Sequence, residues 1–99
     1  MNKITSYVGF AIKARKVLIG QSLIKGNKTK QIFCLLLCSS ASENLINLAN
    51  NVANKQNCEL ITINNLEEIT HISGLKILAI TDESLGNAII KNKENVNLG

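Results

Sequence analysis

Apolar residues recur along the chain with the spacing of helical faces and of buried strands. In residues 2–15, apolar side chains at Ile4, Val8, Ala11 and Ile12 share one face of a helix. The longest apolar run, residues 32–38, has no polar alternation, so we expect a strand covered on both faces. Three further strands are predicted, over residues 17–19, 59–63 and 76–81. Four further helices are predicted: residues 21–25, one ending at Asn57, a short one broken at Ser73-Gly74, and one ending before residue 92.

Polar residues mark the ends of these helices. Ser40 or Ser42 is the expected N-cap of the helix that ends at Asn57, and Asp82 or Ser84 that of the last helix. Gly26-Asn27, which tolerates the left-handed conformation, is expected to end the helix over residues 21–25.

The order of elements predicts an α/β fold. Strands that alternate with helices at this spacing form a three-layer α/β/α sandwich, here on a four-stranded, mostly parallel or mixed sheet. A chain of 99 residues fits one domain, so we expect residues 1–99 to form it, with a frayed tail from about residue 92.

Composition excludes several classes of protein. Hydrophobic residues make up 45% of the chain, but the run over residues 32–38 is far shorter than the roughly 20 residues that cross a bilayer. The apolar stretch over residues 8–12 contains Gly9 and ends at Lys13, unlike a signal peptide. We expect a cytoplasmic protein with no membrane association.

The three cysteines favour reduced thiols. Cys34 and Cys38 lie four residues apart in one predicted strand, hence roughly 13 Å apart, too far for one disulfide or one zinc ion. We expect buried thiols and no metal site.

Charge is distributed unevenly. The net charge is +4, yet residues 1–31 carry seven basic residues and no acidic one, whereas the rest carry four basic and seven acidic residues. Such segregation attracts polyanions, nucleic acid above all, although the same lysines also suit solvated helix faces.

The sequence has no motif that indicates an enzyme active site. Gly20 and Gly26 fit neither a dinucleotide fingerprint nor a P-loop, and the one histidine, His71, has no partner arranged as in an activated nucleophile. The acidic pairs Glu67-Glu68 and Asp82-Glu83 lie at predicted helix starts, where the helix dipole favours carboxylates. We expect no enzyme and no small-molecule cofactor.

Loops that follow strands are the candidate binding sites, because ligands of α/β sheets gather at the carboxyl ends of strands. The candidates are the turn at Gly20 and the loops Ser39-Ser40 and Thr81-Asp82. Gly20 lets an RNA backbone approach closely, while Gln21 and Ser22 offer bonds to base edges or to a phosphate. The basic candidates for phosphate contacts are Lys16, Lys25, Lys28 and Lys30.

Aromatic side chains for stacking bases are few. Tyr7, Phe10 and Phe33 are all expected to be buried. Their burial favours recognition of a structured RNA by shape and backbone over stacking of single-stranded bases.

Three motifs resemble a known family. Residues 7–20, YVGFAIKARKVLIG, resemble the opening of the YlxQ-like branch of the ribosomal-protein superfamily that binds kink-turn RNA. Residues 38–44, CSSASEN, are similar to its strand-to-helix loop, and residues 79–86, AITDESLG, to its last strand and following turn. The resemblance covers about residues 4–91.

The resemblance implies an α/β/α sandwich that binds an RNA internal loop. By position, one RNA surface is Gly20, Gln21, Ser22 and Lys25, and a second, which covers an extruded base, is Ser73, Gly74 and Leu75. Gln21-Ser22 stands where strong kink-turn binders have Asn-Glu, and Lys25 comes one residue earlier than their lysine.

We therefore expect a non-enzymatic, ribosome-associated RNA-binding protein whose partner is a kink-turn-like internal loop or ribosomal RNA. One alternative is a protein-interaction module on the same fold, in which RNA binding has degraded and the Asn-rich helix over residues 45–57 or the sheet edge meets a partner. A further alternative is an enzyme, or the substrate-recognition domain of an RNA-modifying enzyme.

Overall fold

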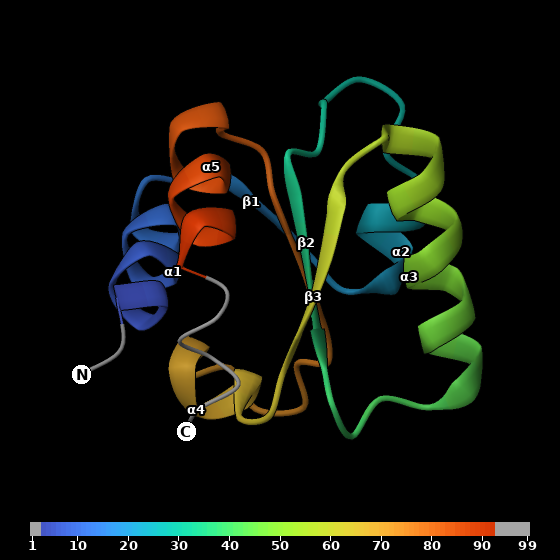
Figure 1. Ribbon diagram of the computed structural model, residues 1–99. Helices are drawn as coiled ribbons and strands as arrows, with labels where there is room; N and C mark the ends of the chain where they lie inside the picture. Colours follow the sequence, from blue (N-terminus) through green and yellow to red (C-terminus); the bar gives the residue numbers. More distant parts are fainter. Residues whose placement is uncertain (1–2, 93–99) are drawn as a thin grey trace.

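The computed structural model describes residues 3–92 as three layers, with a four-stranded sheet between two layers of helices (Figure 1). The predicted α/β/α sandwich is therefore confirmed. Its elements in chain order are α1 (Lys3–Lys13), β1 (Val17–Ile19), α2 (Gln21–Lys25), β2 (Cys34–Cys38), α3 (Glu43–Gln56), β3 (Glu59–Ile63), α4 (Leu66–Thr70), β4 (Ile77–Ile80) and α5 (Glu83–Lys91).

The apolar run forms strand β2, inside the sheet, with all five of its residues buried. Its side chains alternate between the two faces. Leu36 packs in the core beneath α1, α4 and α5, whereas Leu35 and Leu37 pack in the core beneath α2 and α3. Because both faces are covered, the strand needs no polar side, and the sequence shows none.

The sheet is mixed. Its strand order is β1-β4-β2-β3; β2 and β3 are parallel, whereas β4 runs antiparallel to both β1 and β2. The direction of β4 decides which loops share an end of the sheet.

Two helix ends differ from the sequence prediction. Helix α1 ends at Lys13, since Arg15 has a left-handed φ of 58°, and Asn2, predicted to start it, lies outside the described residues. Helix α4 ends at Thr70 because His71 has φ 60°, so Ile72 lies beyond the helix.

Two strands are shorter than predicted. Strand β2 spans Cys34–Cys38; the Phe33 N–H still donates to Ile80 O, but the Ile32 N–H donates to Gln56 Oε1 at 3.1 Å, outside the sheet. Strand β4 spans Ile77–Ile80, within the predicted residues 76–81.

The structure shows which of the alternative N-cap residues are used. Ser42 Oγ accepts from the Leu45 N–H at the start of α3, and Asp82 Oδ2 accepts from the Leu85 N–H at the start of α5. Asn57 ends α3 in the left-handed conformation, as predicted.

Helix α2 ends at Gly26, as predicted, but Gly26 has φ −84°, so the left-handed conformation expected at this end is wrong. Its N–H bonds to Ser22 O, and a Cβ at Gly26 would meet that oxygen at 3.0 Å.

The loops at one end of the sheet are tied together by backbone hydrogen bonds. The Gly20 N–H donates to Ile77 O, the Cys38 N–H to Lys76 O and the Ser39 N–H to Ile63 O. We call this the Gly20 end; it comprises residues 20–22, 39–40, 64–65 and 73–76. In Figure 1 the loops after β2 and β3 and before β4 meet at the bottom of the sheet.

The turn Thr81-Asp82, the third candidate loop of the sequence, lies at the end of the sheet opposite Gly20. The Thr81 N–H donates to the Lys16 carbonyl, ahead of β1, because β4 runs antiparallel to its neighbours. Within residues 3–92 no helix is long and apolar enough to cross a membrane.

Candidate functional site

The turn from β1 to α2 depends on Gly20. Its φ of 83° and ψ of 148° lie in a region that side chains strongly disfavour. A Cβ at this position would have no atom within 4 Å, so the space beside the backbone is open. No side chain of the described residues caps α2, which leaves its first N–H groups without a capping oxygen.

The loop before β4 has a second glycine of this kind. Gly74 has φ 78°, and a Cβ there would also meet nothing within 4 Å. Leu75, next to it, is buried and points into the core, so backbone forms the surface at this point. The glycine therefore leaves room for a ligand to come close to the backbone of this loop.

The two glycine loops lie together. Gly20, Gln21, Gly74 and Leu75 line one hollow of about 200 Å³, which we call the glycine hollow. Its other lining residues are Leu45, Lys76 and Ile77. Two residues from each of the RNA surfaces implied by the resemblance, far apart in the sequence, thus line one hollow, whereas Ser22, Lys25 and Ser73 are not part of its lining.

Ser40 belongs to a neighbouring hollow of about 190 Å³, the serine hollow. The exposed Ser40 hydroxyl accepts from Lys76 Nζ at 2.9 Å and lies 3.2 Å from Cys38 Sγ. The remaining lining residues of the serine hollow are Asn64, Asn65, Leu66, Glu67 and Glu68. Lys76 lines both hollows, so the two form one continuous region of the Gly20 end.

Lys76 also forms an ion pair. Its Nζ donates to Glu67 Oε1 at 2.8 Å. The hydrogen bond and charge of Lys76 lower the pKa of Glu67, and the same bond raises the pKa of Lys76. Both groups are therefore charged at neutral pH. The sequence did not indicate this pair, because Glu67 in α4 and Lys76 in the loop before β4 are nine residues apart and no local pattern relates them.

Cys38 lies under the serine hollow and is 4% exposed. Burial opposes ionisation of its thiol, but hydrogen bonds with Ser40 and the charge of Lys76 outweigh burial and lower its pKa. Burial raises the pKa of Cys58. Both strand cysteines are buried, as expected, and neither is joined by a disulfide to another described residue. Among residues 3–92, no group of three or more metal-binding side chains is close enough to hold an ion.

Three predicted lysines follow the glycine turn. Lys25 ends α2, and Lys28 and Lys30 lie in the segment that leads to β2; all three are exposed. Asn27 shapes this segment, since its Oδ1 accepts from the Lys30 N–H at 3.1 Å and its Nδ2 donates to Lys30 O. Because β2 begins beside Ile80, these lysines extend from the end of α2 toward the end of the sheet opposite Gly20 (Figure 1).

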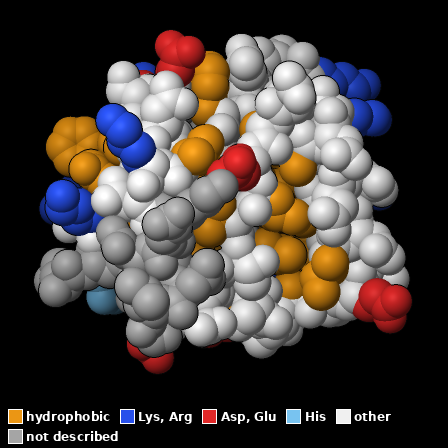
Figure 2. Space-filling view, viewed as in Figure 1, with side chains coloured by type: hydrophobic (Ala, Val, Ile, Leu, Met, Phe, Trp, Pro, Cys, Tyr) orange, Lys and Arg blue, Asp and Glu red, His pale blue; other side chains and the backbone are white. Residues whose placement is uncertain are grey.

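Lys16 lies at the end of the sheet opposite Gly20, where its carbonyl accepts the Thr81 N–H. The basic segment is divided by the sheet, because α1 packs on one face and α2 on the other. Lys3 and Lys13 of α1 are accordingly on a different side from Lys25. On the side shown in Figure 2, basic side chains lie at the two margins of the molecule, with the sheet edge between them.

Phe10 is 65% exposed on α1, so its predicted burial is wrong. The helix buries Ile4, Val8 and Ala11, and Phe10 lies on its other side. Tyr7 and Phe33, also predicted to be buried, are only half-buried.

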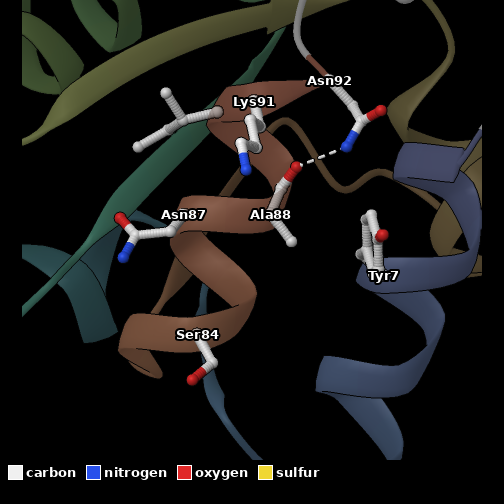
Figure 3. A pocket seen from close by; sticks show the side chains of 7 residues that line it. Tyr7, Ser84, Asn87, Ala88, Lys91 and Asn92 are labelled. Carbon is white, nitrogen blue, oxygen red and sulfur yellow. Dashed lines mark hydrogen bonds between the residues drawn. The ribbon is translucent and has the colours of Figure 1, made fainter.

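A third hollow, of about 640 Å³, lies along α5 and includes Tyr7 of the neighbouring α1 in its lining (Figure 3). Its lining includes Tyr7 of α1 and Asn87, Ala88 and Lys91 of α5. In Figure 3, Ala88 lies on the side of α5 toward Tyr7, whereas Asn87 points to the other side. Asn92 closes the helix end by donating to Ala88 O at 2.7 Å. The lining is mostly aliphatic and amide groups, and no residue predicted to bind RNA lies in it.

A scan against models of protein families and a search of curated proteins found no match to this chain. A search of solved structures found a protein with unknown function from Bacillus halodurans C, with a TM-score of 0.81 and 16% sequence identity. The match covers 95% of this chain and 99% of that protein. At this identity the likeness shows the fold alone.

Proposed function

We propose that this chain is a non-enzymatic RNA-binding protein of the ribosomal type, similar to the YlxQ-like branch of the kink-turn-binding superfamily. Its Gly20 end holds a structured RNA internal loop or a piece of ribosomal RNA. In the cytoplasm, it acts in association with the ribosome.

The adjacency of the two glycine loops carries the proposal. The family resemblance assigns RNA contacts to the turn after the first strand and to the loop before the last strand. In this chain, Gly20 and Gln21 from the first and Gly74 and Leu75 from the second line one hollow. A single RNA segment in the glycine hollow reaches both loops.

The chemistry of the hollow suits a nucleic-acid backbone. Gly20 and Gly74 have open space where a side chain would stand, so a sugar or phosphate can come close to the main chain. Gln21 and Ser22 are exposed and offer hydrogen bonds beside it. Ser39, Ser40 and Ser73, also exposed at this end, add hydroxyl groups for phosphate or sugar contacts.

The exposed lysines that follow the turn supply the charge. Lys25 ends α2, the helix that begins at the Gly20 end. Lys28 and Lys30 lie farther along, in the segment that leads to the start of β2 at the opposite end of the sheet. Because each neutralised phosphate releases counterions, RNA affinity falls steeply with salt, with a log–log slope of about −0.9 per contact on duplex-like segments. Four to six contacts, about the number we expect, give a slope between roughly −4 and −5.

Salt-dependent gel shifts test this surface. We expect the wild-type chain to bind a kink-turn RNA or bulk ribosomal RNA. Replacing both Lys25 and Lys28 by Ala makes the slope less steep by up to about two units, because two phosphate contacts are lost.

A charge-matched control is the double variant Lys3→Ala and Lys13→Ala. Both lysines belong to α1, which packs on the other face of the sheet from α2. We expect its slope to equal that of the wild type. If the Lys25 and Lys28 double variant has the same slope as the wild type, this surface does not bind the RNA. If the wild-type chain binds neither RNA, the result favours a protein-interaction module.

A further inference from the structure

Lys76 occupies a central position in the Gly20 end. Among the described residues it is the one cation that lines the glycine hollow, and it also lines the serine hollow. Its backbone is fixed, since its carbonyl accepts the Cys38 N–H at 2.7 Å. An RNA phosphate in either hollow would therefore lie near its side chain.

The charge of Lys76 is already engaged. Glu67 Oε1 lies 2.8 Å from its Nζ, and Ser40 Oγ 2.9 Å from it. The side chains of Lys76 and Glu67 are 36% and 39% exposed, so the pair is open to solvent and to a competing anion. Exposed pairs of this kind are weak, and an RNA phosphate can displace the carboxylate.

We propose that Lys76 is a further phosphate-binding residue of the Gly20 end and that Glu67 competes with RNA for it. This inference rests on the proposed RNA-binding function. In the free protein, Glu67 neutralises Lys76 and weakens its attraction for anions in general. An RNA that fits the glycine hollow places a phosphate near Nζ and replaces the carboxylate, so the pair favours well-fitted RNA over other polyanions.

Substitution of Glu67 tests the competition. We expect Glu67→Gln to tighten RNA binding by about two- to fivefold, the effect of removing one exposed ion pair. In a Lys76→Gln background the same substitution should give no gain, since the freed ammonium is then absent. Gel shifts of the four chains with kink-turn RNA and with bulk ribosomal RNA measure the coupling.

Glu68→Gln is the matched control. Glu68 is next to Glu67 in the first turn of α4 and lines the same hollow, yet it forms no ion pair within residues 3–92. General charge repulsion predicts that both substitutions tighten binding alike. Our proposal predicts that only Glu67→Gln clearly tightens RNA binding.

The outcomes separate this inference from the function on which it rests. RNA binding by the wild type with equal effects of the two Gln substitutions overturns the role of Lys76 and leaves RNA binding standing. A gain from Glu67→Gln that persists without Lys76 also overturns it. Failure of both the wild type and the Glu67→Gln variant to bind either RNA overturns both proposals. Circular dichroism of each variant checks the fold.

Discussion

Gly20 and Gly74 show how single residues shape the candidate site. Both have positive φ values, and neither has an atom within 4 Å of the position that a Cβ would occupy. The backbone conformation, and not crowding, therefore accounts for glycine at both positions. The same open space makes the glycine hollow accessible to a ligand.

Gly20→Ala should lower the free energy of unfolding by about 1–3 kcal/mol, the usual cost of a side chain in such a backbone region. Gly9→Ala is the control, because Gly9 lies within α1 and a Cβ there also meets nothing within 4 Å. It should raise stability by up to about 1 kcal/mol through helix propensity. Urea denaturation distinguishes the two, and a shift of both variants in the same direction would contradict the explanation.

At the scale of elements, local sequence predicted most of the structure. Capping side chains at Ser42 and Asp82 and apolar spacing located α3 and α5. Errors occurred where the backbone turned without a recognisable signal, as at Arg15 and His71, whose φ values near 60° are uncommon for such residues. Helix ends of this kind depend on how the chain enters the next element.

The packing of α5 on β2 requires a small residue at Gly86. A Cβ at Gly86 would lie 2.8 Å from the Phe33 Cβ, which precedes β2. In an exposed helix a change from Gly to Ala raises the free energy of unfolding by up to about 1 kcal/mol, but overpacking of a buried site lowers it by about 1–3 kcal/mol.

We therefore expect Gly86→Ala to lower the free energy of unfolding, as measured by urea titration. Asn87→Ala, at the next and exposed position of α5, should be neutral or slightly stabilising. Equal stability of the two Ala variants would show that α5 shifts to relieve the contact.

At the scale of the molecule, β2 joins the two cores. It pairs with β3 on one side and β4 on the other, and its side chains enter the packing beneath both helical layers. The pairing with β4 also brings residues 73–76 beside the loop after β2. Stability and the geometry of the Gly20 end thus depend on the same strand.

Leu36→Ala removes a fully buried side chain from β2. The lost burial and the cavity cost about 2–5 kcal/mol, a large part of the roughly 5–15 kcal/mol that stabilises a domain. Leu23→Ala, at a side chain 58% exposed, should cost far less. Urea denaturation measures both, and a Leu36→Ala cost below that of Leu23→Ala would argue against this core.

The amino-acid sequence alone determined the helices and strands, the three layers and the buried central strand. These features depend on local periodicity and capping, which neighbouring residues set. Tertiary structure decided the antiparallel direction of β4, the distribution of the basic residues over two faces and the pairing of Lys76 with Glu67. These depend on contacts between segments distant in the chain, whose free energies no local pattern records.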